Sequence, residues 1–220
     1  MKNLIFLLSI LGSALSFAGT ESGGGGGVVA TSNRPVLIDF YQLANPSVMV
    51  SEISETDDAF KQAVDILDTW QRLPLDNISY LVGFSFSGPV EWIFTHNKLK
   101  EFDHHRPMNI SEHERIETVA YYSIKNSIYQ INLFRPIWEQ MDITNQTALL
   151  IHESLRHVQL GLKSYFNEEA LQQATVIYML CRPTVRLSSY LNNLLHNNTE
   201  LNQKVYGSFN DILSKSCMRK

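Results

Sequence analysis

The sequence has few cysteines, no excess of basic charge and no long apolar run beyond its first residues. It contains 2 cysteines in 220 residues, with 18 lysines and arginines against 22 acids, for a formal net charge of -4. Interspersed charges of this balance form no basic patch, which argues against phosphate backbones and anionic lipids as partners. No later stretch reaches the ~20 apolar residues that cross a bilayer. We therefore expect no nucleic-acid partner and no membrane span.

Residues Met1 to Ala18 have the three parts of a secretory signal peptide. Lys2 supplies the positive start, Leu4 to Leu8 begin an apolar stretch, and small residues such as Ser16 precede Gly19. The apolar stretch is shorter than a membrane anchor of ~20 residues. We therefore expect residues 1–18 to be removed and the remaining chain to be secreted or periplasmic.

The two cysteines, Cys181 and Cys217, would then lie in an oxidising compartment. Two cysteines allow only one pairing, so we expect one disulfide between them. A loop of this length would stabilise the fold by roughly 3–4 kcal/mol in the chain-entropy picture.

Residues 19–34 contain the run Gly23 to Gly27 and many small polar side chains. This composition buries too little apolar surface to fix one conformation, so it predicts a flexible leader. A phosphate-binding loop is the alternative, but the pattern lacks a preceding strand and a following Lys-Ser/Thr pair. Residues 35–220 are then expected to form a single domain.

The apolar pattern of that domain predicts strands first and helices afterwards. Residues 35–43 are compatible with a buried strand or a short helix, and a helix capped by Thr56 should end before Pro74. We expect strands at 78–86 and 90–95, a hairpin of 116–122 with 127–134, and helices from Asp142 or Thr144 to about 162, 167–181, 185–196 and 200–216. This order favours an α+β fold with a small antiparallel or mixed sheet and a helical C-terminal half.

The most regular of these helices contains His152-Glu153-Ser154-Leu155-Arg156-His157. A zinc peptidase helix places two histidines at i and i+4, on one face, with a glutamate after the first as general base. Here His152 and Glu153 fit, but Arg156 occupies the i+4 position. His157 would point about 140° away from His152 around the helix, and a guanidinium has no lone pair to offer a metal.

The order of hairpin, His-Glu helix and second helix resembles the minimal core of zinc peptidases of the gluzincin group. In that group a glutamate of the second helix, often in an Asn-Glu-x-x-Ala context, is the third ligand, and this chain has Asn167-Glu168-Glu169-Ala170. The resemblance implies a zinc site with His152 as first ligand, Glu153 as base and Glu168 as third ligand. Arg156 departs from this pattern.

The segment Tyr129 to Val158, with Trp138, Met141 and Asp142, is also similar to small bacterial secreted proteins of unknown function. They carry a signal peptide, a glycine run, a strand and an apolar His-Glu helix without the second histidine. The resemblance implies a family with a degenerate, zincin-like helix that tolerates loss of a ligand.

A purely structural interpretation is also open. Glu153 can pair with Arg156 at i+3 or with His157 at i+4 on a partly exposed helix. His152 can then be a core histidine whose ring nitrogens are hydrogen-bonded within the protein.

Residues Gly83 to Gly88 approach the Gly-x-Ser-x-Gly elbow of serine hydrolases. They lack its second glycine and its following helix.

A further cluster, Asp103-His104-His105 with Glu112, His113 and Glu114, fits a solvated loop or a loose metal site. It is also a possible source of a second histidine for a site at His152.

Two functions follow from these patterns. The first is an exported binding protein, a pseudoenzyme or envelope-associated protein with an unidentified exported partner, in which the His-Glu helix is scaffold. The alternative is a zinc-dependent peptidase or other hydrolase that uses His152, Glu153 and Glu168.

Overall fold

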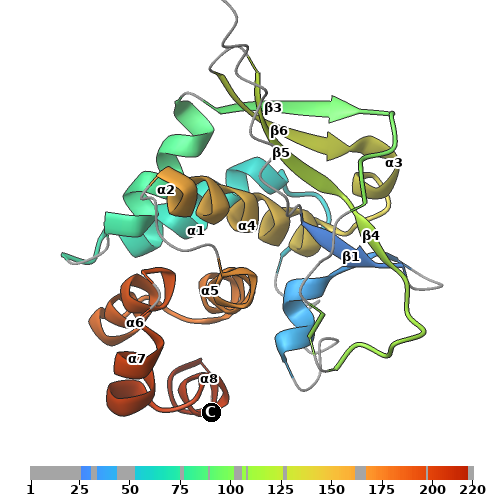
Figure 1. Cartoon of the computed structure of the whole chain (residues 1–220). Coiled ribbons are helices and arrows are strands. Elements are labelled where there is room, and N and C mark those ends of the chain that lie inside the picture. Colours follow the sequence, from blue (N-terminus) through green and yellow to red (C-terminus); the bar gives the residue numbers. More distant parts are fainter. Residues whose placement is uncertain are drawn as a thin grey trace, which may run out of the picture.

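The structure is a computed structural model (Figure 1). It describes residues 26–30, 34–43, 53–74, 77–88, 90–101, 106–107, 109–125, 128–161, 167–196 and 198–217. The expected signal peptide and most of the glycine run lie outside these residues.

The chain forms an α+β fold with its helices gathered in the C-terminal half, as the sequence predicts. In chain order the elements are β1 (Gly27–Val29), β2 (Val36–Leu37), the 3-10 helix η1 (Ile38–Gln42), α1 (Ala59–Gln71), α2 (Asn77–Ser87), β3 (Val90–Thr95), β4 (Ile116–Thr118), β5 (Ala120–Lys125), β6 (Ile128–Phe134), α3 (Arg135–Trp138), α4 (Ile143–Gly161), α5 (Glu168–Leu180), α6 (Val185–Leu195), α7 (Thr199–Tyr206), α8 (Phe209–Ile212) and the π-helical turn η3 (Leu213–Cys217).

The larger sheet has the strand order β3-β6-β5 and lies along one side of the molecule in Figure 1. β5 and β6 form the predicted hairpin, closed by the pair Lys125 and Ile128. β3 runs parallel to β6, so the sheet is mixed. Side chains of Ile131 and Leu133 alternate inward along β6, as expected for a strand with one face on the core.

The second sheet, in the order β2-β1-β4, corrects the sequence analysis. Gly27–Val29 were assigned to a flexible leader, yet they form a fully buried strand between β2 and β4. The Gly26 carbonyl extends this pairing by accepting from the backbone N–H groups of Val119 and Ala120. Two valines next to the glycine run supply enough apolar surface to fix this end of the leader.

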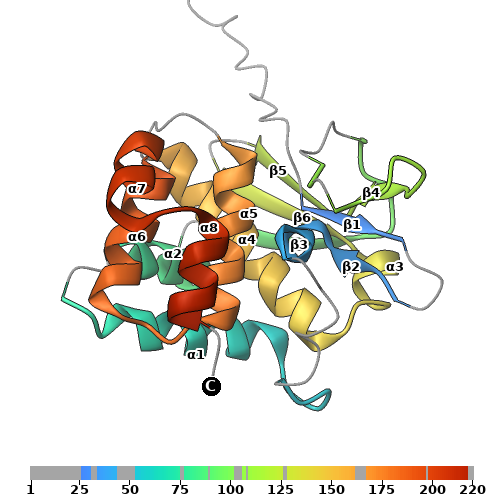
Figure 2. The same ribbon diagram turned by 90° about the horizontal axis from the view of Figure 1, so that it is seen from below.

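Helix α4 lies at the centre of the fold, between the sheets and the other helices (Figures 1 and 2). It packs against α1, α2, α5, β2 and β5. Every residue from Thr144 to Arg156 is buried. A helix buried on all sides must also bury its polar residues, and these then need partners inside the protein.

Residues 78–86, predicted as a strand, form helix α2. Ile78, Val82 and Ser85 are buried at helical spacing against α1 and α4. β-branched and aromatic residues suit the half-buried face of a strand or of a helix. Packing against α1 and α4 makes this segment a helix.

Two helix boundaries also differ from expectation. The N-cap of α1 is Asp58, whose side chain accepts from Lys61 N, and not Thr56. The helix predicted at 200–216 is interrupted at Gly207, the only described glycine with positive φ, at 83°. Asn167 caps α5 as predicted, accepting from Ala170 N.

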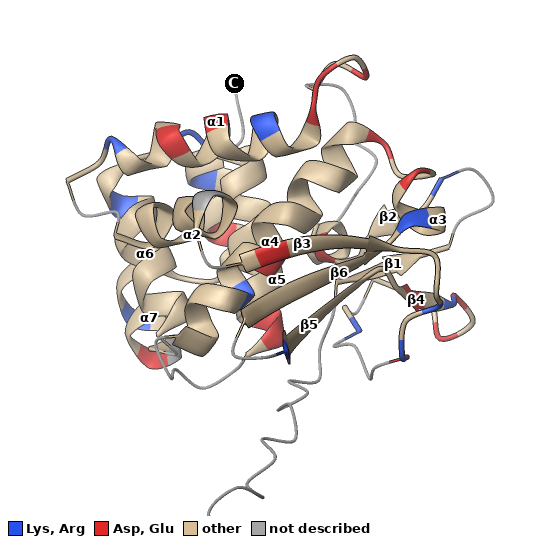
Figure 3. Cartoon of the chain, turned by 90° about the horizontal axis from the view of Figure 1, so that it is seen from above, with Lys and Arg blue, Asp and Glu red and all other residues tan. Residues whose placement is uncertain are grey.

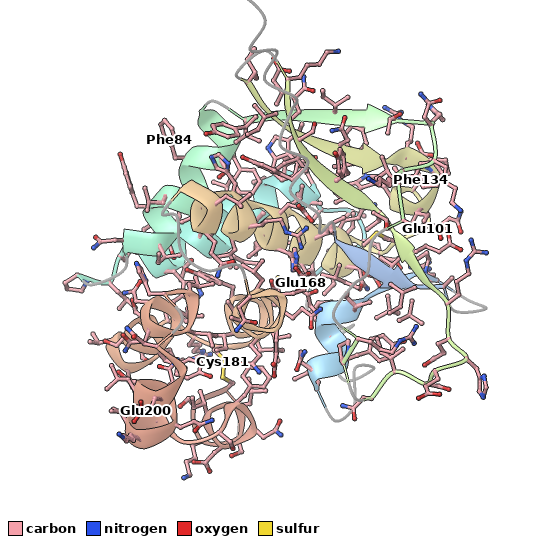
Figure 4. The ribbon with its side chains drawn as sticks, viewed as in Figure 1. Phe84, Glu101, Phe134, Glu168, Cys181 and Glu200 are labelled. Atoms are coloured by element: carbon pink, nitrogen blue, oxygen red, sulfur yellow. A yellow bond between two sulfur atoms is a disulfide. The ribbon has the colours of Figure 1, made fainter. Side chains whose placement is uncertain are left out.

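The predicted disulfide is present. Cys181, at the end of α5, bonds to Cys217, 36 residues later in η3, with a Cα–Cα distance of 4.5 Å, and Figure 4 shows it beside the C-terminal helices. Within the described residues, no helix is both long enough and apolar enough to cross a bilayer.

Candidate functional site

The polar residues of α4 meet two other parts of the chain in a buried ionic cluster. It consists of Asp39, His152, Glu153, Arg156 and Glu168. The first four side chains are at most 1% exposed, and that of Glu168 is 12% exposed. Figure 4 places Glu168 near the middle of the molecule, beside α4.

Arg156 is the centre of this cluster. Its Nη2 lies 2.7 Å from His152 Nε2 and 2.9 Å from both carboxylate oxygens of Glu168. Its Nη1 lies 3.8 Å from Glu153 Oε1. The guanidinium thus contacts every residue that the sequence proposes as a metal ligand or base.

His152 is held from the other side by Asp39, because its Nδ1 lies 2.6 Å from Asp39 Oδ2. Burial lowers the pKa of His152, the Asp39 carboxylate and a hydrogen bond with Glu168 raise it, and the Arg156 charge lowers it, for a net pKa of about 10. A doubly protonated ring would, however, set an Nε2–H against an Arg156 N–H at 2.7 Å. Since a guanidinium keeps its protons, we assign the neutral ring, with Nδ1–H donating to Asp39 and Nε2 accepting from Arg156.

Asp39 reaches this position because η1 is fixed at both ends. The backbone N–H of Leu37 donates to Asn145 Oδ1 of α4 at 2.8 Å, and the Gln42 side chain donates to Gln172 of α5 at 2.7 Å. Asp39 is not among the site residues predicted from the sequence. The signal was a lone acid inside the apolar run of residues 36–43, because a charge in a buried segment requires a partner.

Glu153 contacts the N-terminal strand. Its Oε1 accepts from Gly26 N at 2.6 Å, while Oε2 has no hydrogen-bond partner among the described residues. Burial raises the pKa of Glu153, and the nearby Arg156 opposes this only in part. A Cβ on residue 26 would collide with Leu149 Cδ1 and approach Glu153 Oε1, so any larger residue would have to displace the Leu149 side chain. The backbone therefore covers the carboxylate directly.

His157 lies outside the cluster, as its position on the helix predicts. Its Nδ1 is 3.1 Å from the hydroxyl of Tyr122, and its ring packs against Tyr122 and Tyr129 of the hairpin. Burial lowers the pKa of His157. The helix is buried here and not partly exposed, and of the two alternative partners predicted for Glu153, Arg156 is the one in contact.

The other candidates do not join this site. Ser85 is buried within α2, so residues 83–88 form no elbow between strand and helix. Glu112 and His113 are exposed, while Asp103, His104 and His105 lie outside the described residues. In the described part of the chain, no three His, Cys, Asp or Glu side chains converge as a metal site. In Figure 3 acidic and basic residues are interspersed over the outer helices.

The arrangement does not fit a zinc ion as it stands. Zinc needs the lone pair of His152 Nε2 and a Glu168 oxygen within bonding distance, and the Arg156 guanidinium takes both. Comparisons of the chain with protein-family models, with curated proteins and with solved structures find no match.

Proposed function

We propose that the protein is an exported, non-catalytic binding protein whose His-Glu helix is a zincin-like helix with a guanidinium in place of the metal. The observation that carries the proposal is the set of Arg156 contacts to His152 Nε2 and to both oxygens of Glu168. A permanently charged side chain there offsets the charge of the Glu168 carboxylate as a bound cation would. It offers no Lewis acidity and no bound water to activate.

The expected signal peptide and the disulfide between Cys181 and Cys217 support export, because disulfides persist in oxidising compartments. The cluster itself is closed to solvent at Asp39, Glu153 and Arg156, which are buried, and Gly26, the residue before β1, covers Glu153. A partner would therefore bind elsewhere on the molecule, and the cluster would support the fold that presents that surface.

One observation favours the second candidate, a zinc-dependent hydrolase. Metal-bound histidines usually donate their second ring N–H to a carboxylate, and His152 donates to Asp39 in this way. Zinc would then require the Arg156 side chain to leave the cluster and expose Glu168 and Nε2. The base Glu153 would also have to release Gly26 N.

The zinc content of the purified wild type and of three variants separates the two functions. The wild type is expected to bind no stoichiometric zinc, whereas Arg156→His restores histidines at i and i+4 and is expected to gain one zinc per chain. The double variant His152→Ala/Arg156→His should lose it again. Arg182→His, at an exposed position, is the control for adventitious binding.

Stoichiometric zinc in the wild type that is lost in His152→Ala would overturn the proposal in favour of the hydrolase. A folded Arg156→His variant that takes up no zinc would contradict the zincin-like character of the helix. Folding is checked by circular dichroism in each case.

A further inference from the structure

Strand β3 forms an open edge of the larger sheet. The order β3-β6-β5 leaves one side of β3 without a neighbouring strand, and Figure 1 shows β3 as the outermost strand. Among the described residues, no backbone group bonds to that side of β3. The opposite edge, at β5, is covered in part, because the Gly26 carbonyl accepts from Val119 and Ala120 and α4 packs against β5. The open edge is therefore the one at β3.

The strand register identifies the backbone groups at this edge. Phe134 N donates to Val119 O, so the backbone of residue 134 faces β5, and by alternation residues 129, 131 and 133 of β6 face β3. In a parallel pair such residues bond to the positions on either side of their partners. Those partners are Val90, Trp92 and Phe94. The N–H and C=O groups of these three residues therefore point away from the sheet.

This edge has none of the features that usually block strand pairing. Lysine, proline and β-bulges protect the edges of most natural sheets. The sequence of β3 is Val-Glu-Trp-Ile-Phe-Thr, and its register with β6 is continuous. Its one charged side chain, Glu91, accepts from Gln130 of the same sheet at 2.8 Å. A strand with these properties can pair with a further strand.

Exposed apolar side chains of α2 lie beside the edge. Tyr80 is 65% exposed, Phe84 50% and Leu81 36%. A Cβ on Gly88, just before β3, would lie 2.7 Å from Phe84 Cε1, so the Phe84 ring is adjacent to the start of the strand. Figure 4 shows Phe84 pointing away from the protein. The open edge thus continues into an apolar surface.

The composition of this region favours a second copy of the chain as the partner. Residues 77–95 contain one charged residue, although 18% of the whole chain is charged. Homodimer interfaces are apolar and poor in charge, whereas a foreign strand would find no charge pattern here that selects it. Antiparallel pairing of β3 with itself about Trp92 places Val90 opposite Phe94 of the second copy. Glu91 then lies opposite Ile93 of the second copy, so no like charges are directly opposed.

We propose that the protein forms a two-fold dimer in which β3 pairs antiparallel with β3 of a second copy about Trp92. The two larger sheets then join into one continuous sheet, and Phe84 lies at the border of the interface. The edge contains no residue of the ionic cluster, so this inference goes beyond the proposed function and does not depend on it.

The test is sedimentation equilibrium of the chain from residue 19 at about 1–100 μM, where the wild type should dimerise with a Kd in the micromolar range. Ile93 lies on the face of β3 away from the core, since its neighbours Trp92 and Phe94 pack against the core. Ile93→Glu and Ile93→Lys should therefore both fold, and both lose the same apolar side chain. The glutamate would oppose Glu91 of the second copy and should weaken the dimer about tenfold. The lysine would pair with Glu91, so its dimer should be about tenfold tighter than that of Ile93→Glu.

A second set of measurements does not depend on those variants. Phe84→Ser should weaken the dimer about fivefold, whereas Leu201→Ser, at a 45% exposed position on α7, should leave the Kd unchanged. In the wild type, the backbone amides of Trp92 and Phe94 should exchange with deuterium more slowly as protein concentration rises, because each gains an acceptor in the dimer.

Three results would overturn the proposal: a monomer at every concentration, equal dissociation constants for Ile93→Glu and Ile93→Lys, or exchange at Trp92 and Phe94 that does not change with concentration. If circular dichroism shows that an Ile93 variant does not fold, the wild-type exchange decides. None of these measurements involves zinc, so the outcome is separate from that of the Arg156→His experiment.

Discussion

Removing the guanidinium of Arg156 tests whether the buried cluster stabilises the fold. Arg156→Met keeps an unbranched side chain of similar reach but takes away the hydrogen bonds to Glu168 and His152 and the charge near Glu153. Breaking a buried ion pair by removing one partner costs about 3–5 kcal/mol, because the other charge stays buried and unpaired. We expect the free energy of unfolding to fall by that amount, a large share of the ~5–15 kcal/mol typical of a domain.

The cost should come from the stranded carboxylates and not from lost packing. Arg156→Met/Glu168→Gln removes the charge that the single variant strands, so the double variant should be more stable than Arg156→Met alone. The coupling energy of this cycle should reach about 0.5–3 kcal/mol, the usual range for residues of one network.

Urea unfolding followed by circular dichroism measures all variants. Arg182→Met, an exposed arginine, is the matched control and should change stability by less than ~0.5 kcal/mol. A loss below ~1 kcal/mol in Arg156→Met, or strictly additive effects in the double variant, would refute the assignment of Arg156 as the cation that holds the cluster together.

Three further predictions concern the surroundings of α4. Because burial raises the pKa of Glu153, stability is greatest below its unfolded pKa and is lost as pH rises through the folded pKa. Glu153→Gln still accepts from Gly26 N, so its urea midpoint should match the wild type in acid and exceed it at pH 8. Gly26→Ala, which drives a Cβ into Leu149, should cost about 1–3 kcal/mol in the same assay, whereas Gly161→Ala, with open space around it, should not. Burial lowers the pKa of His157, so the wild type should lose stability as pH falls from about 6.5 through the folded pKa. Thermal melting of His157→Gln should lack that part of the pH dependence.

Features set by local chemistry were predictable from the sequence. The helix that contains His152, the Asn167 cap of α5 and the strand at 127–134 each depend on residues within one segment, and the structure confirms them. The disulfide followed from there being two cysteines and no others.

Features set by distant partners were not predictable. Residues 78–86 became a helix because α1 and α4 lie against them, and no local pattern encodes those neighbours. Gly26 joins the cluster through its backbone N–H, a group that every residue but proline has, so the sequence gives no sign of it. The pairing of Asp39 with His152 spans 113 positions of the chain.

A hydrolase interpretation would treat the three acids of the cluster as remains of an active site. The cluster instead gives each of them a structural role. Asp39 connects η1 to α4 through His152, Glu153 connects β1 to α4 through Gly26 N, and Glu168 connects α5 to α4 through Arg156. Each acid thus attaches a different element to one central helix, and the Arg156 guanidinium offsets the charge of Glu168, to which it donates. Under the proposed function, replacing any one of these acids by alanine, which removes the acceptor as well as the charge, should loosen its own element first, as faster amide exchange there. A catalytic role for Glu153 predicts the opposite, namely lost turnover with unchanged exchange in β1.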